Sequence, residues 1–174
     1  MSNVRKRTPR PVLLGLLLAA LSSGCSKDAM ESADNAQEPT TVVLQLQAGD
    51  ELNPTTDGYS APVRVRLLEL RSAAAFSRTD YFSLAERAAT SLGNELVAED
   101  EWLVHPGQTR ELTRVLDPAT RHLGLVVGYR EIDRAQWRLV LEPKQGTLTH
   151  YRIDLGINAA SAAELAAPSR LDSR

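Results

Sequence analysis

The stretch HLGLVVGYREIDRAQWRLVLEP, residues 122–143, contains two apolar runs in which large side chains stand at every second position. An apolar residue at alternate positions is typical of a β-strand with one buried face. Gly124 and Gly128 stand on the opposite face of the first run, where a missing side chain favours close packing or a bend. The residues predicted to share a buried face are Leu123, Leu125, Val127 and Tyr129 in the first run, and Trp137, Leu139 and Leu141 in the second. This stretch therefore predicts two short strands.

The same period of two recurs through the rest of the chain. Further strands are predicted in TVVLQLQ (41–47), PVRVRLLEL (62–70), ELVAEDEWLV (95–104), QTRELTRVL (108–116) and TLTHYRIDLG (147–156). The alternation slips at Leu67 and Leu68, which suggests a β-bulge there. Short strands with turns about every eight to twelve residues are typical of an antiparallel β-sandwich. We therefore predict a mainly β fold, a sandwich of about seven to eight strands.

One segment changes to a helical period. The apolar residues that recur there at the spacing of a single helix face are Tyr81, Leu84, Ala85, Ala88 and Leu92. Ser83 and Glu86 have the spacing of a capping box, and Gly93 is a typical helix stop. We predict a small helical insertion that packs on the sheet.

The N-terminus has the layout of an export signal. Four basic residues come first, residues 11–21 form an apolar run of eleven, and small residues then lead into Cys25. Since a membrane span needs about 20 apolar residues, this run is expected to belong to a cleaved signal peptide, residues 1–24. The chain would then continue through a polar tether, residues 25–39, into a domain over residues 40–157. The last residues, 158–174, are rich in small side chains and are predicted to be a tail that frays or forms a loose helix.

Cys25 is the only cysteine of the chain, so it cannot belong to an internal disulfide framework. No residue near it would act as the base that a catalytic thiol needs. Small residues before a cysteine at the end of an apolar run resemble the bacterial lipoprotein signal, in which that cysteine is acylated. Ser22 departs from this pattern, which usually has leucine three residues before the cysteine. The sequence therefore predicts lipidation of Cys25, with ordinary cleavage and a free thiol as the alternative.

Charge and motifs exclude several classes of function. Removal of residues 1–24 leaves 16 basic and 22 acidic residues, a formal net charge of −6, which gives no electrostatic basis for binding nucleic acid. His105, His122 and His150 are too widely spaced for a compact metal site. The acidic run Glu99, Asp100 and Glu101 is predicted to be a solvated strand edge, because adjacent strand residues point to opposite faces. No catalytic, cofactor or metal-binding motif is present, and we expect no enzyme activity.

The segment AGDELNPTTDGYSAP, residues 48–62, is a long connection rich in turn signals. Two to five residues suffice for a hairpin, and loops of this length are often functional. Tyr59, Leu52 and Asp57 are the side chains that we expect to contact a partner, since they supply an aromatic, an aliphatic and a charged group.

The order of these segments resembles the outer-membrane lipoprotein family of the type VI secretion system, the TssJ or SciN-like family. The resemblance covers roughly residues 40–157. It depends on the lipobox-like Cys25, on Leu52-Asn53-Pro54 with Gly58 before PVRVRLLELR, on FSRTDYFSL (76–84) and on HLGLVVGYREIDRAQWR (122–138).

This resemblance implies a non-catalytic, transthyretin-like β-sandwich that lies under the outer membrane. It implies binding to the periplasmic C-terminal region of TssM, and through TssM to TssL, in a trans-envelope complex. In the family the loop between the first two strands takes part in TssM binding, and this loop corresponds to residues 49–61. Asn53, Pro54 and Gly58 match the family pattern and are expected to shape the loop. Two alternatives remain: a small-ligand carrier lipoprotein of the cell envelope, and an envelope hydrolase that uses carboxylates or histidines.

Overall fold

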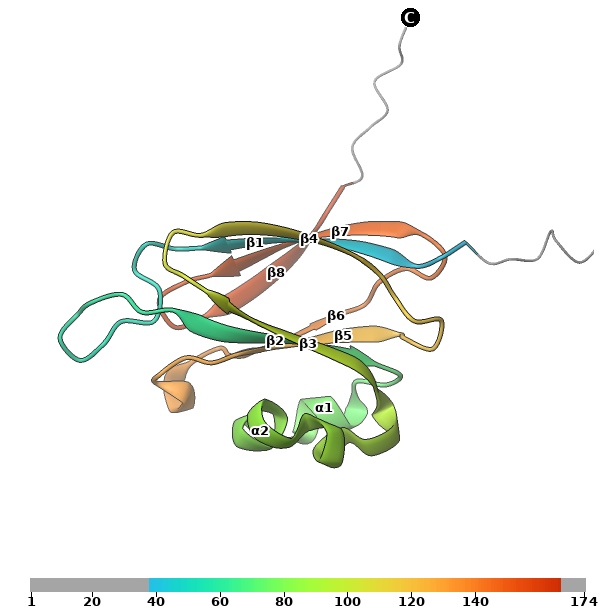
Figure 1. Ribbon diagram of the computed structural model, residues 1–174, viewed down its shortest axis with the longest axis horizontal. Coiled ribbons are helices and arrows are strands. Elements are labelled where there is room, and N and C mark those ends of the chain that lie inside the picture. The colour runs from blue at the N-terminus through green and yellow to red at the C-terminus, as the bar shows by residue number, and fades with distance from the viewer. Residues whose placement is uncertain (1–37, 167–174) are drawn as a thin grey trace, which may run out of the picture. The chain divides into compact units, whose positions relative to one another are not determined.

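The computed structural model describes residues 38–166, and these residues form two β-sheets packed face to face with a helical layer on one side (Figure 1). Residues 1–37 and 167–174, which include Cys25, the predicted signal peptide and most of the predicted tether, lie outside the described part. The elements are β1 (Thr41–Ala48), β2 (Val63–Leu70), α1 (Ala74–Arg78), α2 (Tyr81–Leu92), η1 (Gly93–Glu95), β3 (Leu96–Val104), β4 (Thr109–Val115), β5 (His122–Val127), η2 (Ile132–Arg134), β6 (Arg138–Leu141), β7 (Leu148–Leu155) and β8 (Ala160–Leu165).

The eight strands form two four-stranded sheets, which confirms the predicted mainly β sandwich with a small helical insertion. Sheet A has the order β4-β1-β7-β8, and sheet B has the order β3-β2-β5-β6. All neighbouring strands are antiparallel except β1 and β7, which run parallel. Among residues 38–166, no helix is long and apolar enough to cross a membrane.

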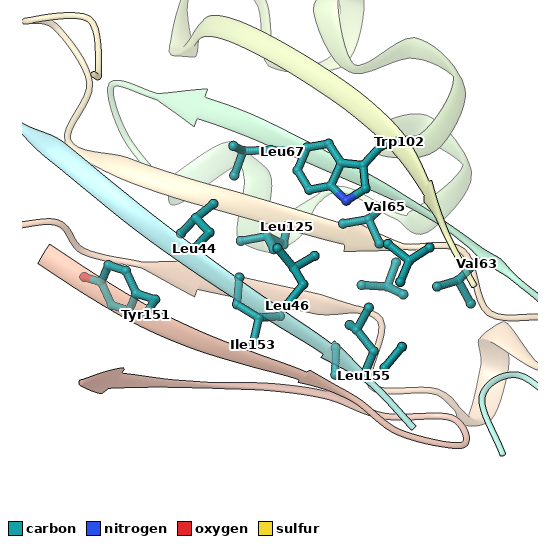
Figure 2. Packing of buried hydrophobic residues seen from close by; sticks show 14 of the residues in the cluster. Leu44, Leu46, Val63, Val65, Leu67, Trp102, Leu125, Tyr151, Ile153 and Leu155 are labelled. Carbon is teal, nitrogen blue, oxygen red and sulfur yellow. The ribbon is translucent and has the colours of Figure 1, made fainter. Parts of the chain in front are cut away.

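The core lies between the two sheets and is built from alternate residues of the strands (Figure 2). Sheet A contributes Leu44, Leu46, Tyr151, Ile153 and Leu155, and sheet B contributes Val63, Val65, Leu67, Trp102 and Leu125. In β1 the polar Gln45 and Gln47 point the other way, as the period of two predicts.

The two central strands of sheet B, β2 and β5, are largely buried on both faces, because the helices cover the face that turns away from sheet A (Figure 1). The cluster under the helices contains Leu68, Leu70, Phe76, Leu84, Ala88, Leu92 and Val126. Leu67 and Leu68 therefore face two different clusters, and no bulge separates them. The predicted bulge position was wrong, since the register between β2 and β3 shifts between Glu69 and Leu70.

Helix α2 packs on sheet B through the predicted apolar face, but it begins before the predicted cap. Its N-cap is Asp80, whose carboxylate accepts a hydrogen bond of 3.0 Å from the backbone N–H of Ser83. Ser83 therefore lies inside the first turn. Gly93 ends the helix with a φ of 52°, a conformation that glycine adopts without strain.

The C-terminal segment differs from the prediction of a tail after residue 157. Ala160–Leu165 forms β8, an edge strand that pairs antiparallel with β7. The pairing satisfies the outer backbone groups of β7 and adds Ala160 to the core. The sandwich thus extends beyond the predicted boundary.

Strands run between two ends of the sandwich, which we call the tether end and the loop end. The tether end is where the described chain begins, at Glu38, and where Thr41 pairs with Val115 and Leu148. The loop end is about 23 Å away along β1. It carries the connections β1–β2 (residues 49–62), β3–β4 (105–108), β5–β6 (128–137) and β7–β8 (156–159).

Candidate partner-binding loop

The β1–β2 loop, residues 49–62, leads from sheet A to sheet B at the loop end (Figure 1, left). A connection between two packed sheets must span about 10 Å, which accounts for part of a length that a hairpin would not need. The remaining residues project beyond the sandwich.

The base of the loop is anchored in the core. Leu52 has no exposed surface and belongs to the cluster between the sheets. Its carbonyl oxygen accepts a hydrogen bond of 3.0 Å from the N–H of Ala61, so the two arms of the loop are joined there. The hydroxyl of Ser60 also donates to the carbonyl of Asp50 at 2.6 Å. The two arms of the loop are therefore hydrogen-bonded to each other where the loop leaves the sandwich.

Asn53 connects the loop to two neighbouring connections. Its backbone N–H donates to the carbonyl of Ile157 at 2.9 Å, and its side-chain oxygen accepts from the N–H of Arg130 at 2.8 Å. Its side-chain NH₂ donates to the carbonyl of Pro62 at 3.1 Å. The residue is only 5% exposed and has a φ of 48°, which asparagine tolerates better than most residues. Asn53 thus holds three segments together from a buried position.

Gly49 provides a further link at the loop end. Its carbonyl oxygen accepts hydrogen bonds of 3.2 Å from the N–H groups of Leu52 and Gly107, and its own N–H donates to Leu155 at 2.9 Å. Gly107 lies in the β3–β4 connection, so all four connections of the loop end are joined by hydrogen bonds. This network gives the projecting part of the loop a fixed base.

The tip of the loop is a tight turn over residues 55–59. The N–H of Gly58 donates to the carbonyl of Thr55 at 2.9 Å, and the N–H of Thr55 donates to the carbonyl of Tyr59 at 2.7 Å. Gly58 has a φ of 82°, as expected for a turn followed by a one-residue bulge. Directly after the turn, the side chain of Tyr59 is 75% exposed. The tip therefore presents an aromatic ring on an ordered backbone.

The predicted contact residues fall into two groups. Pro54, Asp57, Gly58 and Tyr59 lie on the surface of the loop. Leu52 and Asn53 are buried, so their side chains hold the loop in place and do not reach its surface. Leu52 was expected to contact a partner, and its burial corrects that expectation: it is the one large apolar side chain of the loop base.

Three surface residues beside the loop, Ile157, Arg130 and Asn158, were not singled out from the sequence. Ile157 is 50% exposed, and with Arg130, Pro54 and Asn158 it lines a depression of about 80 Å³ beside the loop. A small-molecule site usually has about 300–1,000 Å³, so this depression suits one protein side chain better than a ligand. Asn53 helps to bring these residues together, since its backbone N–H donates to Ile157 and its side-chain oxygen accepts from Arg130. No local signal in the sequence indicates these long-range contacts.

Tyr129 also borders this depression but offers no acid–base chemistry. It is 4% exposed, and burial raises the pKa of its hydroxyl well above the ordinary value. The hydroxyl therefore stays protonated at neutral pH.

The histidines and the acidic run lie apart from the loop tip and from one another. His122 begins β5 at the tether end, His150 lies on the outer face of sheet A, and His105 is in the β3–β4 connection. Within residues 38–166 no group of three His, Cys, Asp or Glu residues comes together as a metal site. Glu99 pairs with Arg66 at 2.7 Å, whereas Asp100 pairs with Arg114 at 3.1 Å on the other face of β3. These carboxylates thus form ion pairs along a sheet edge.

Comparison with known proteins identifies the family of this fold. The family model described as "Type VI secretion lipoprotein, VasD, EvfM, TssJ, VC_A0113" matches residues 40–158. The crystal structure of the T6SS lipoprotein TssJ1 from Pseudomonas aeruginosa is 45% identical, with a TM-score of 0.73, over 75% of this chain and 99% of that chain. No curated protein matches the chain.

Two further solved structures share the fold at lower identity. Serratia marcescens Lip, described as a membrane-bound component of the type VI secretion system, is 27% identical with a TM-score of 0.68, over 74% of this chain and 99% of that chain. A chain of the structure titled "T6SS protein TssM C-terminal domain (869-1107) from EAEC" is 22% identical with a TM-score of 0.58, over 73% of this chain and 98% of that chain. At that identity the likeness concerns the fold alone. From the family model and the 45% identity to TssJ1, the chain belongs to the type VI secretion lipoprotein family that includes VasD, EvfM and TssJ.

Proposed function

We propose that this protein anchors a type VI secretion trans-envelope complex to the outer membrane, through acyl chains on Cys25 and through binding of TssM by the β1–β2 loop. The partner region is the periplasmic C-terminal part of TssM, which in turn connects to TssL. One observation carries the proposal: an ordered loop with an exposed aromatic ring projects at the end of the sandwich opposite to Glu38, where the described chain begins.

Exposed aromatic residues on a rigid base are typical of binding hot spots. Tyrosine adds a large contact area at a small cost in conformational entropy, and truncation of such a residue often costs more than about 2 kcal/mol of binding free energy. Tyr59 meets this description, since the residue is 75% exposed and its backbone is held by the turn over residues 55–59. Ile157 and Pro54, which line the depression beside the loop, would extend the apolar contact.

The anchor follows from the chemistry of acylation. Each buried CH₂ contributes about 0.8 kcal/mol, so one acyl chain binds a membrane marginally and two or more bind it stably. Fourteen residues separate Cys25 from Thr40, and as a random coil they would span about 20 Å. The protein would couple membrane and partner mechanically, with no bond chemistry. The anchor also keeps the loop near its partner, at an effective concentration in roughly the millimolar range.

The packing of the sandwich argues against the carrier alternative. The space between the sheets is filled by side chains with little or no exposed surface, such as Leu44, Leu125 and Ile153. A carrier would need a cavity at this position.

The loop is tested by co-purification with a periplasmic C-terminal fragment of TssM. Residues 55–59 are replaced by five residues of alternating glycine and serine, which removes the tip and leaves the buried Leu52 and Asn53 in place. We expect recovery of the TssM fragment to fall sharply, with an unchanged urea midpoint of unfolding. The matched control is Leu103→Ala, a 51% exposed side chain in β3. Equal recovery with both variants would place the contact elsewhere.

The anchor is tested by membrane fractionation of Cys25→Ser, with Ser32→Ala in the predicted tether as its control. We expect only the first variant to leave the membrane fraction and to stop secretion. Unchanged fractionation of Cys25→Ser would contradict acylation as the anchor.

A further inference from the structure

The outer face of sheet A carries an apolar patch at the tether end. Thr41 pairs with Val115 on one side and with Leu148 on the other, so these three side chains form one row across β4, β1 and β7. Val42 and Leu44 point into the core, and successive strand residues point to opposite faces, so the row that contains Thr41 lies on the outer face of sheet A. Val115 is 63% exposed and Leu148 is 54% exposed. We call Val115, Thr41 and Leu148 the tether-end patch.

The composition of this face changes along the strands. The next row contains Val43, which is 7% exposed, between Thr113 and His150. The rows after it are polar, with Gln45 between Glu111 and Arg152, and then Gln47 between Thr109 and Asp154. Apolar exposure on sheet A is therefore concentrated at the end where the described chain begins.

A groove of about 750 Å³ adjoins the patch. Val115 lines it together with Pro39, Pro118, Arg121 and Gln145. The guanidinium of Arg121 donates to the carbonyls of Pro118 at 2.7 Å and Thr120 at 2.9 Å, and to the side-chain oxygen of Gln145 at 3.1 Å. Within residues 38–166 it forms no ion pair with a carboxylate, and Glu38 is the acidic residue that lines the same groove. The tether end thus combines exposed aliphatic side chains with an available cation.

If Cys25 is acylated, the short segment between it and the domain brings the tether end near a membrane. Glu38, at the rim of the groove, is 13 residues from Cys25. A random coil of that length has a root-mean-square span of about 20 Å, so the anchor would hold the tether end within roughly that distance of the bilayer. Aliphatic side chains and an arginine are the groups that bind at the interface between acyl chains and lipid phosphates.

We propose that the tether-end patch docks on the phospholipid surface, with Val115 and Leu148 below the headgroups and Arg121 facing lipid phosphates. This inference rests on the proposed acylation of Cys25. Docking turns the tether end of the outer face of sheet A towards the membrane, and because the later rows of that face are polar, the loop end and its β1–β2 loop tilt away from the bilayer. The sandwich then presents the loop to its partner in one preferred orientation.

The test uses the full chain, processed and acylated, in vesicles of phosphatidylethanolamine and phosphatidylglycerol. The acylated sulfur of Cys25 is blocked, so Val115→Cys and Leu148→Cys each provide the only reactive thiol for an environment-sensitive fluorophore. Leu103→Cys is the control, because Leu103 is similarly exposed at 51% but lies near the loop end, opposite Arg64. Some of the lipids carry a nitroxide quencher near the headgroup.

We expect a blue shift and strong quenching at positions 115 and 148, and neither at position 103. Equal signals at positions 115 and 103 would overturn the docking. A dilution series distinguishes contact with lipid from contact with a second copy of the chain. When the vesicles hold on average less than one protein molecule each, the blue shift should persist. Loss of the shift on dilution would assign the patch to self-association and overturn the docking. If mass spectrometry shows no acyl chains on Cys25, the anchor and the docking both fail, whereas acylated protein without quenching at 115 overturns the docking alone.

Discussion

The side-chain oxygen of Asn53 accepts a hydrogen bond of 2.8 Å from the backbone N–H of Arg130, which joins the β1–β2 loop to the β5–β6 connection. The two residues are 77 positions apart in the sequence. The bond is part of a network that also includes Pro62 and Ile157. It explains how a loop of turn-forming residues keeps a defined shape at the end of the sandwich.

Replacement of Asn53 by alanine should therefore destabilise the domain. Asn53→Ala leaves the N–H of Arg130 and the carbonyl of Pro62 without a partner and places alanine at a positive φ. We expect a loss of about 2–4 kcal/mol in the free energy of unfolding, measured by urea denaturation. Asp57→Ala at the exposed tip is the control, with an expected change within about 0.5 kcal/mol. Equal stabilities of the two variants would show that the network contributes nothing.

Gly124 should be intolerant of a larger side chain. A Cβ there would lie 2.7 Å from the ring of Phe76, which packs α1 on sheet B. We expect Gly124→Ala to cost about 1–3 kcal/mol in the free energy of unfolding through overpacking. In a chain that carries Phe76→Leu the same substitution should cost less, because the ring is gone. A cost that does not depend on Phe76 would place the strain elsewhere.

The cap of α2 should make stability depend on pH in the acidic range. The N–H of Ser83 donates to the carboxylate of Asp80, and this bond holds the pKa of that carboxyl below its ordinary value. A carboxyl with a lowered pKa in the folded state stabilises the fold above its unfolded pKa, and the contribution is lost as the pH falls through the folded pKa. The stabilisation by the charged cap is therefore lost below about pH 5, around and beneath the usual aspartate pKa of about 4.

Urea titrations of the native chain and of Asp80→Asn, from about pH 6 to about pH 2, measure this effect. The native chain should be more stable at the upper end, and the difference should shrink towards zero at the lower end. Asp80→Ser should follow Asp80→Asn at every pH, since neither cap titrates. A difference that stays constant with pH would contradict the role of the charge.

The fold could be predicted where the chain has a clear period. Strands such as β1 and β7 alternate large apolar and polar residues, and α2 repeats its apolar residues at helical spacing. Strand β8 was missed because only Ala160 of it is buried, while Ala162 and Glu164 at the alternate positions are exposed, so the strand shows no apolar alternation. The cap was misplaced because Asp80 and Ser83, only three residues apart, are both good N-cap residues. The parallel pairing of β1 and β7 is a long-range contact without a local signal.

The candidate partner-binding loop was also predicted only where local sequence signals exist. Turn chemistry indicated the tip with Asp57 and Gly58, and the exposed Tyr59 follows it. The burial of Leu52 and the links from Asn53 to Arg130 and Ile157 depend on segments that meet only in the folded chain. Cys25 lies outside the described residues, so its acylation remains a prediction.

The dissociation constant of the complex with the periplasmic C-terminal region of TssM, measured for Tyr59→Ala and for Leu103→Ala, tests the central claim most directly. Both substitutions remove an exposed side chain and should leave the urea midpoint unchanged. We predict that Tyr59→Ala weakens binding by about tenfold or more, which corresponds to about 1.4 kcal/mol, and that Leu103→Ala has little effect. The same dissociation constant for the native chain and for Tyr59→Ala would contradict the account.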